Sequence, residues 1–146
     1  PLVWVGREGR AIGCIHSGGG GRITRMGQVR VEAMMEAFGT KPEDLIAWGG
    51  PSICRDCFEV GGEVVEEFRE AFGPEQRVAL YCQGKRPGKY QLDLWKANEI
   101  IFREAGIRRE NIHITNICTM CNSDYLFSHR KVGEARGNLA PFLCLK

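Results

Sequence analysis

The segment AIGCIHSGGGGRITRMGQVRVEAMMEAFG, residues 11–39, determines the fold of the N-terminal part of the chain. It opens with an apolar strand pattern that ends at His16, continues through four consecutive glycines and then shows a helical repeat. Apolar residues at helical spacing predict a helix from Thr24 to Phe38, and Gly39 is a typical helix stop. A strand that passes through a glycine turn into a helix is typical of α/β proteins.

The same patterns extend outward from this segment. The predicted strands are LVWV (2–5), DLIAW (44–48), RVALYC (77–82), NIHIT (111–115), LFSHR (126–130) and NLAPFLCLK (138–146). Further helices are predicted from Val60 to Phe72 and from Leu92 to Ala105, each followed by a glycine. We therefore expect one α/β (α+β) domain over residues 1–146, with a mixed β-sheet flanked by helices.

Composition excludes several functional classes. The formal net charge is +2 and the basic residues are dispersed, so we expect no nucleic-acid partner. No apolar run is long enough to cross a membrane and no signal peptide opens the chain, so we expect no membrane partner. Seven cysteines, an odd number, indicate reduced thiols and a cytoplasmic location. Cys14, Cys82 and Cys144 have apolar neighbours and are expected to be buried.

Two C-x-x-C pairs are candidates for a metal site. They are CRDC, with Cys54 and Cys57, and CTMC, with Cys118 and Cys121. Four thiolates suit a tetrahedral zinc ion, but some sixty residues separate the pairs, against about 15–20 in a zinc ribbon. A long-range four-thiolate site is therefore the less favoured interpretation.

The end of the first strand pattern is a candidate binding site. His16 lies where α/β proteins place binding groups, between a strand and a glycine turn. The backbone N–H groups of Gly18 to Gly21, before a helix, could hold a phosphate, although a flexible turn explains the same residues. In the predicted strand 126–130, Ser128 and Arg130 would share one face.

Several longer strings occur together in a familiar order: CIHSG, PEDLIAWGGPSICRDCFEVGGEV, GKYQLDLWKANEIIFREAGI, ICTMCNSDYLFSHR and RGNLAPFLCLK. Over essentially its whole length the chain resembles the laccase-domain (YfiH-type) family. Members are described as purine nucleoside phosphorylases and as multicopper polyphenol oxidases. The resemblance implies a zinc-dependent enzyme that acts on adenosine- and inosine-type nucleosides with phosphate, together with adenosine deamination. We leave the oligomeric state open.

The resemblance also assigns roles to residues. The metal site of the family contains a His, a Cys and a second His, and the second His corresponds to His16, which we assign as metal ligand and catalytic residue. The other two ligands would precede Pro1, so the chain resembles an N-terminally truncated member. Bound metal is then expected to depend on His16 more than on Cys57. The expected substrate-binding residues are Gly18, Gly21, Arg22, Ser128 and Arg130.

Two alternatives remain open. Gly19 and Gly20 stand where the family pattern has Trp and Arg, which raises the alternative of an inactive remnant. Copper as cofactor, in a polyphenol oxidase, is the other alternative. A multicopper site needs many histidines, and the chain has three, His16, His113 and His129.

Overall fold

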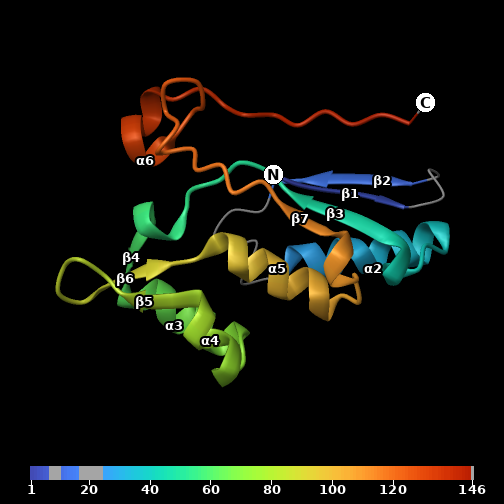
Figure 1. Ribbon diagram of the computed structural model, residues 1–146, viewed down its shortest axis with the longest axis horizontal. Coiled ribbons are helices and arrows are strands. Elements are labelled where there is room, and N and C mark those ends of the chain that lie inside the picture. Colours follow the sequence, from blue (N-terminus) through green and yellow to red (C-terminus); the bar gives the residue numbers. More distant parts are fainter. Residues whose placement is uncertain (7–10, 17–24, 146) are drawn as a thin grey trace. The chain divides into compact units, whose positions relative to one another are not determined.

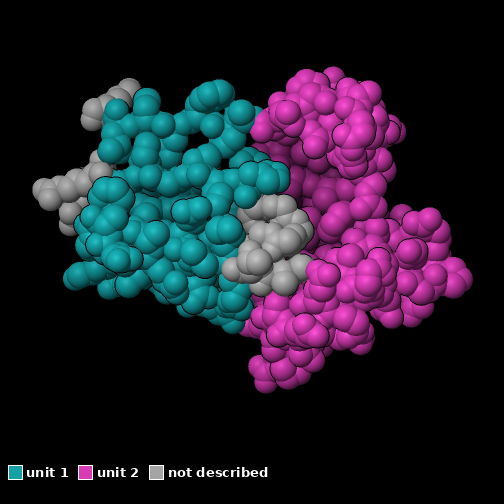
Figure 2. Space-filling model, turned by 180° about the vertical axis from the view of Figure 1, so that it is seen from behind, with its two compact units in different colours: residues 1–50, 98–115, 140–146 teal, residues 51–97, 116–139 magenta. Residues whose placement is uncertain are grey.

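The computed structural model describes residues 1–6, 11–16 and 25–145. They divide into two compact units, coloured separately in Figure 2. Unit 1 comprises residues 1–50, 98–115 and 140–146, and unit 2 comprises residues 51–97 and 116–139. The helix α5 contributes residues to both units.

A mixed four-stranded sheet forms the framework of unit 1. Its order is β2-β1-β3-β7, with β2 (Ile12–Ile15), β1 (Leu2–Gly6), β3 (Leu45–Gly49) and β7 (Ile112–Ile114). Strand β1 pairs antiparallel with both neighbours, whereas β3 and β7 run parallel. The expected mixed sheet is therefore confirmed, as are the first two strands and the strand that follows Pro42.

Two helices cover one face of this sheet (Figure 1). They are α2 (Met26–Phe38) and the later part of α5 (Leu94–Glu104), and short 3₁₀ turns η1 (Pro42–Asp44) and η3 (Arg109–Asn111) precede β3 and β7. The predicted helix stop is confirmed, because Gly39 has a φ of 64° and its N–H donates to the Met35 carbonyl.

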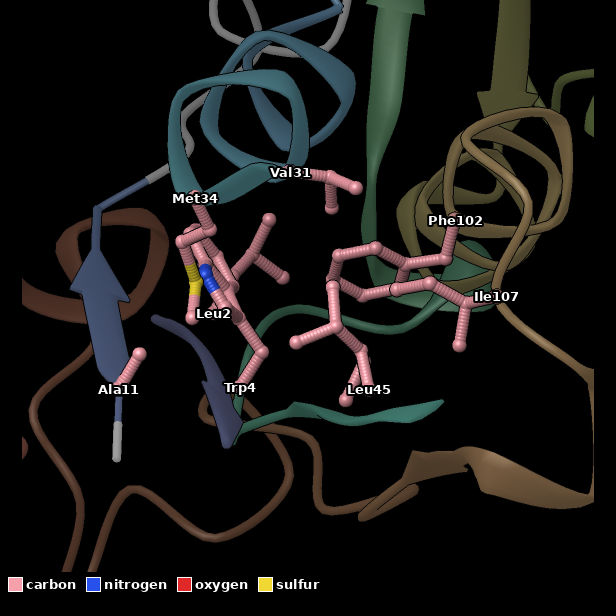
Figure 3. Packing of buried hydrophobic residues seen from close by; sticks show 9 residues of the cluster. Leu2, Trp4, Ala11, Val31, Met34, Leu45, Phe102 and Ile107 are labelled. Atoms are coloured by element: carbon pink, nitrogen blue, oxygen red, sulfur yellow. The ribbon is translucent and has the colours of Figure 1, made fainter. Parts of the chain in front are cut away.

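The core of unit 1 follows from the alternation of β1. Leu2 and Trp4 point to the helices, where Trp4 meets Phe102 edge-on with ring centroids 6.3 Å apart (Figure 3). The buried cluster consists of Leu2, Trp4, Ala11, Val31, Met34, Leu45, Ala47, Phe102 and Ile107. Strand and helix faces with matching apolar residues thus account for the packing.

One position in this sheet has room for glycine alone. Gly13 is the register partner of Trp4, and a Cβ on Gly13 would overlap the indole Nε1. We expect Gly13→Ala to lower the free energy of unfolding by about 1–3 kcal/mol, because the indole would have to move within a packed core. Denaturant titration measures this effect, and combining Gly13→Ala with Trp4→Leu should give less than the sum of the single losses. Additive losses would contradict the proposed contact.

Unit 2 is built on a three-stranded antiparallel sheet. Its order is β4-β6-β5, with β4 (Glu59–Gly61), β6 (Lys89–Leu92) and β5 (Tyr81–Gln83), accompanied by α3 (Gly62–Ala71) and α4 (Pro74–Leu80). Shorter turns are η2 (Arg55–Cys57), α6 (His129–Val132) and η4 (Gly133–Ala135). The buried apolar residues are Val60, Val65, Phe68, Phe72, Leu80, Leu92, Leu94, Ala97 and Cys118.

Four predicted elements were wrong in whole or part. Residues 77–80 of the predicted strand RVALYC are helical, because Pro74 starts α4 and the Gln76 side chain accepts the Gly73 N–H at 3.0 Å. The predicted helix 60–72 begins only at Gly62, since Val60 pairs with Tyr90 in the sheet. Neither 126–130 nor 138–145 forms a strand.

The expectation of one laccase-type domain over residues 1–146 stays a prediction, since the two units are each described by themselves. In the ranges that the structure describes, none of the helices has the length and apolar character needed to span a bilayer.

Candidate metal centre and active-site residues

The two C-x-x-C pairs meet in unit 2. Cys54 and Cys57 lie on the η2 turn, and Cys118 and Cys121 lie on the turn that follows residue 116. The four sulfur atoms are all within 4.8 Å of one another. The interpretation that the sequence separation had disfavoured is therefore the one that fits this geometry, and the four-cysteine cluster could bind a metal.

Backbone pairing brings the two cysteine segments together. Ser52 and Cys118 form an isolated parallel bridge, in which the Ser52 N–H donates to Ile117 and the Ser52 carbonyl accepts from Thr119, both at 3.2 Å. The Ser52 hydroxyl also accepts a hydrogen bond from Trp95 Nε1 at 2.6 Å. Ser52 thus aligns the cysteines, a role that nothing in the sequence pattern indicates apart from its position two residues before Cys54.

The thiols of the cluster differ in acidity. Burial raises the pKa of Cys57, and hydrogen bonds with the Cys121 and Cys54 thiols raise it further. Burial likewise raises the pKa of Cys54. Burial also raises the pKa of Cys118, but the backbone N–H groups and the thiols of Cys121 and Cys54 donate to its sulfur, and these hydrogen bonds lower the pKa to about 7.

His16 lies exposed directly after β2, in unit 1. Among the described residues, the cysteine cluster is the only group of three or more His, Cys, Asp and Glu side chains placed to share a metal ion. The described residues therefore do not complete a three-ligand site around His16. Gly18, Gly21 and Arg22, like Gly19 and Gly20, lie outside the described residues.

Ser128 and Arg130 are placed by a helical turn, so the prediction that they share a strand face was wrong. The N–H groups of Lys131 and Val132 both donate to the Ser128 carbonyl, which starts α6. Ser128 is only 4% exposed, whereas Arg130 is exposed. The Arg130 guanidinium lies 5.1 Å from the centre of the Phe58 ring, and its Nη1 donates to the Glu59 carbonyl at 2.8 Å.

With this geometry established, we compared the chain with known proteins. A family model described as multi-copper polyphenol oxidoreductase laccase matches residues 1–146. The chain belongs to this laccase family. The resemblance found in the sequence is thereby confirmed.

Relatives with assigned activities support the same membership. A purine nucleoside phosphorylase of Bacteroides thetaiotaomicron is 32% identical over 139 residues, which are 95% of this chain and 51% of that protein. Adenosine deaminase RL5, from an unknown prokaryotic organism, is 34% identical over 137 residues, 94% of this chain and 51% of that protein. The chain thus spans about half the length of these relatives.

The fold is confirmed by a solved structure of the family. YlmD from Geobacillus stearothermophilus superposes with a TM-score of 0.82 at 29% identity, covering 90% of this chain and 48% of that one. The α/β class with mixed sheet and helices is therefore shared with the family.

The remaining cysteines correct another expectation. Cys14, Cys82 and Cys144 are all exposed, although their apolar neighbours had predicted burial. Cys14 alternates with the core-facing positions of β2, and Cys144 lies in a segment that forms no strand. An apolar neighbourhood in sequence does not fix the side of a strand on which a residue lies.

Proposed function

We propose that this laccase-family chain is part of a purine nucleoside phosphorylase. In this reaction a phosphate oxygen bonds to C1′ of the ribose, and the bond from C1′ to the purine nitrogen breaks. The purine leaves with the electron pair and takes up a proton. The observation that carries the proposal is the likeness to the Bacteroides phosphorylase along nearly the whole chain. The likeness to RL5 extends the proposal to deamination of adenosine.

Arg130 is the described residue best suited to hold the phosphate. A guanidinium has five N–H donors in a rigid fork, and the hydrogen bond to the Glu59 carbonyl engages one nitrogen of Arg130. The Phe58 ring beneath it orients the group, so less side-chain entropy is lost when an oxyanion binds. Gly18, Gly21, Arg22 and Ser128 stay predictions for substrate binding, as does a cytoplasmic location.

His16 is proposed to act in catalysis and as a zinc ligand. His16 is exposed at the end of β2, and an imidazole is a common zinc ligand. Because the described residues do not complete a three-ligand group around it, zinc at this site needs other donors. The description of the family favours a copper-dependent polyphenol oxidase as the second candidate function.

The two candidates differ in a simple assay. We expect the protein, in its full encoded length, to release hypoxanthine and ribose 1-phosphate from inosine, and to stop when phosphate is omitted. Chromatography of the bases measures this release, with a catechol substrate and added copper as the parallel test. Oxidation of the catechol without phosphorolysis would favour the oxidase. The absence of both activities would favour the alternative of an inactive remnant.

A further inference from the structure

We propose that Cys54, Cys57, Cys118 and Cys121 hold one zinc ion in a closed four-thiolate site that stabilises unit 2 and takes no part in the nucleoside reaction. The site differs from the one proposed at His16 in its ligands and in the unit that carries it. None of its four cysteines is assigned a part in the proposed phosphorolysis. The zinc proposal can therefore be tested independently of the proposed phosphorolysis.

The sulfur positions are close to those that zinc requires. Tetrahedral zinc with Zn–S bonds of about 2.3 Å places its sulfur atoms about 3.8 Å apart. Here the sulfurs of Cys57 and Cys121 are 3.5 Å apart, and all four lie within 4.8 Å of one another. Movements of about 1 Å or less would complete the tetrahedron.

The surroundings of Cys118 suit a thiolate ligand. Its sulfur accepts the N–H of Cys54 at 3.3 Å and the N–H of Cys121 at 3.4 Å. The second bond spans one C-x-x-C turn, and the first joins the two pairs. Backbone N–H groups that donate to ligand sulfurs orient them and stabilise their negative charge. Cys118 is also buried, which limits the access of water to this side of the site.

The scaffold holds the ligand segments in place by contacts that do not involve sulfur. The Ser52–Cys118 bridge aligns the two segments, and Asn122 caps the second turn, because both its N–H and its side-chain amide donate to the Cys118 carbonyl. A prearranged site costs less entropy to fill. Since Cys54 and Cys118 are 64 residues apart, a bound ion would also cross-link distant parts of the chain.

Ligand chemistry favours zinc in a structural role. Thiolates are soft ligands that select zinc or iron–sulfur centres over magnesium or calcium. Four protein ligands fill a tetrahedral ion and leave no position for water or substrate, as in structural zinc sites. A disulfide would engage two sulfurs at about 2.05 Å and would not explain why four converge.

Cobalt substitution and thiol counting test the proposal. We expect the reduced protein to bind Co²⁺ with the near-ultraviolet thiolate-to-metal absorption of a four-sulfur site, and zinc to displace it. Cys121→Ser, at an exposed position, should lose this absorption together with the cluster's zinc. The matched control is Cys82→Ser, an exposed cysteine of the same unit, which should keep both. Removing zinc should make four further thiols reactive and lower the melting temperature of the wild type and Cys82→Ser.

Several results would overturn the proposal. They are unchanged zinc content in both Cys121→Ser and Cys57→Ser, iron as the resident metal, or a disulfide in the reduced preparation. The two variants remove ligands from different segments, so a folding defect in one leaves the other informative. If phosphorolysis is absent while the cysteine cluster still holds its zinc, only the proposed function is contradicted.

Discussion

Phe102→Ala is expected to lower the free energy of unfolding by about 3–5 kcal/mol. Phe102 is fully buried, and its ring meets Trp4 of the sheet edge-on. A Cβ on Gly27 of α2 would lie 3.4 Å from the same ring, so helix and sheet both close around it. Truncation would leave a cavity between β1, α2 and α5, and the surrounding structure relaxes only partially around such a cavity.

Urea titration followed by circular dichroism measures this loss. The control is Phe142→Ala, which removes the same side chain at a position that is 92% exposed and should change stability by less than about 0.5 kcal/mol. Equal effects of the two substitutions would contradict the assignment of the core.

His16→Ala should reduce kcat/KM for phosphorolysis by about a hundredfold or more, the usual consequence of losing a group that takes part in proton transfer or ligation. The imidazole is exposed at a strand end, so we expect the substitution to leave the fold intact. Steady-state kinetics with inosine, alongside a circular dichroism spectrum, give the two measurements.

The matched control is His113→Ala. His113 is an exposed histidine on β7 of the same unit, where it stacks on Trp48 with ring centroids 5.7 Å apart. A larger loss of activity in His113→Ala than in His16→Ala would show that the residue assignments are wrong.

Local periodicity was sufficient to predict an element where that element buries one of its faces. The alternation of β1 and the helical repeat of α2 both point into a single core, so pattern and burial agree. The C-terminal segments lacked this support. LFSHR has an apolar start but leads into three consecutive basic side chains at residues 129–131. The N–H groups of Lys131 and Val132 bond to the Ser128 carbonyl, which starts a helical turn instead of a strand. RVALYC failed because Pro74 and Gln76 upstream of it set a helix start.

The candidate site was harder to predict because it depends on contacts distant in sequence. The C-x-x-C pairs were visible, but spacing alone cannot show that Ser52 pairs with Cys118. Because of this pairing, we no longer expect bound metal to depend on His16 more than on Cys57. We now expect two metal sites, one that depends on His16 and one that depends on Cys57. The roles assigned to the residues of the glycine run depend on the family resemblance, and the described residues do not test these roles.

The parallel register of β3 with β7 also has a kinetic consequence. Ala47 pairs with Ile112, and the Ser52–Cys118 bridge continues the association of the same two stretches of chain. Such contacts form only after a long loop has closed, and the entropy of closure is lost before the contacts compensate for it. During synthesis the first C-x-x-C pair emerges well before the second, so Cys54 and Cys57 are present for some time before Cys118 and Cys121. During that interval an oxidising environment would let Cys54 and Cys57 pair with each other or with other thiols before the second pair is available.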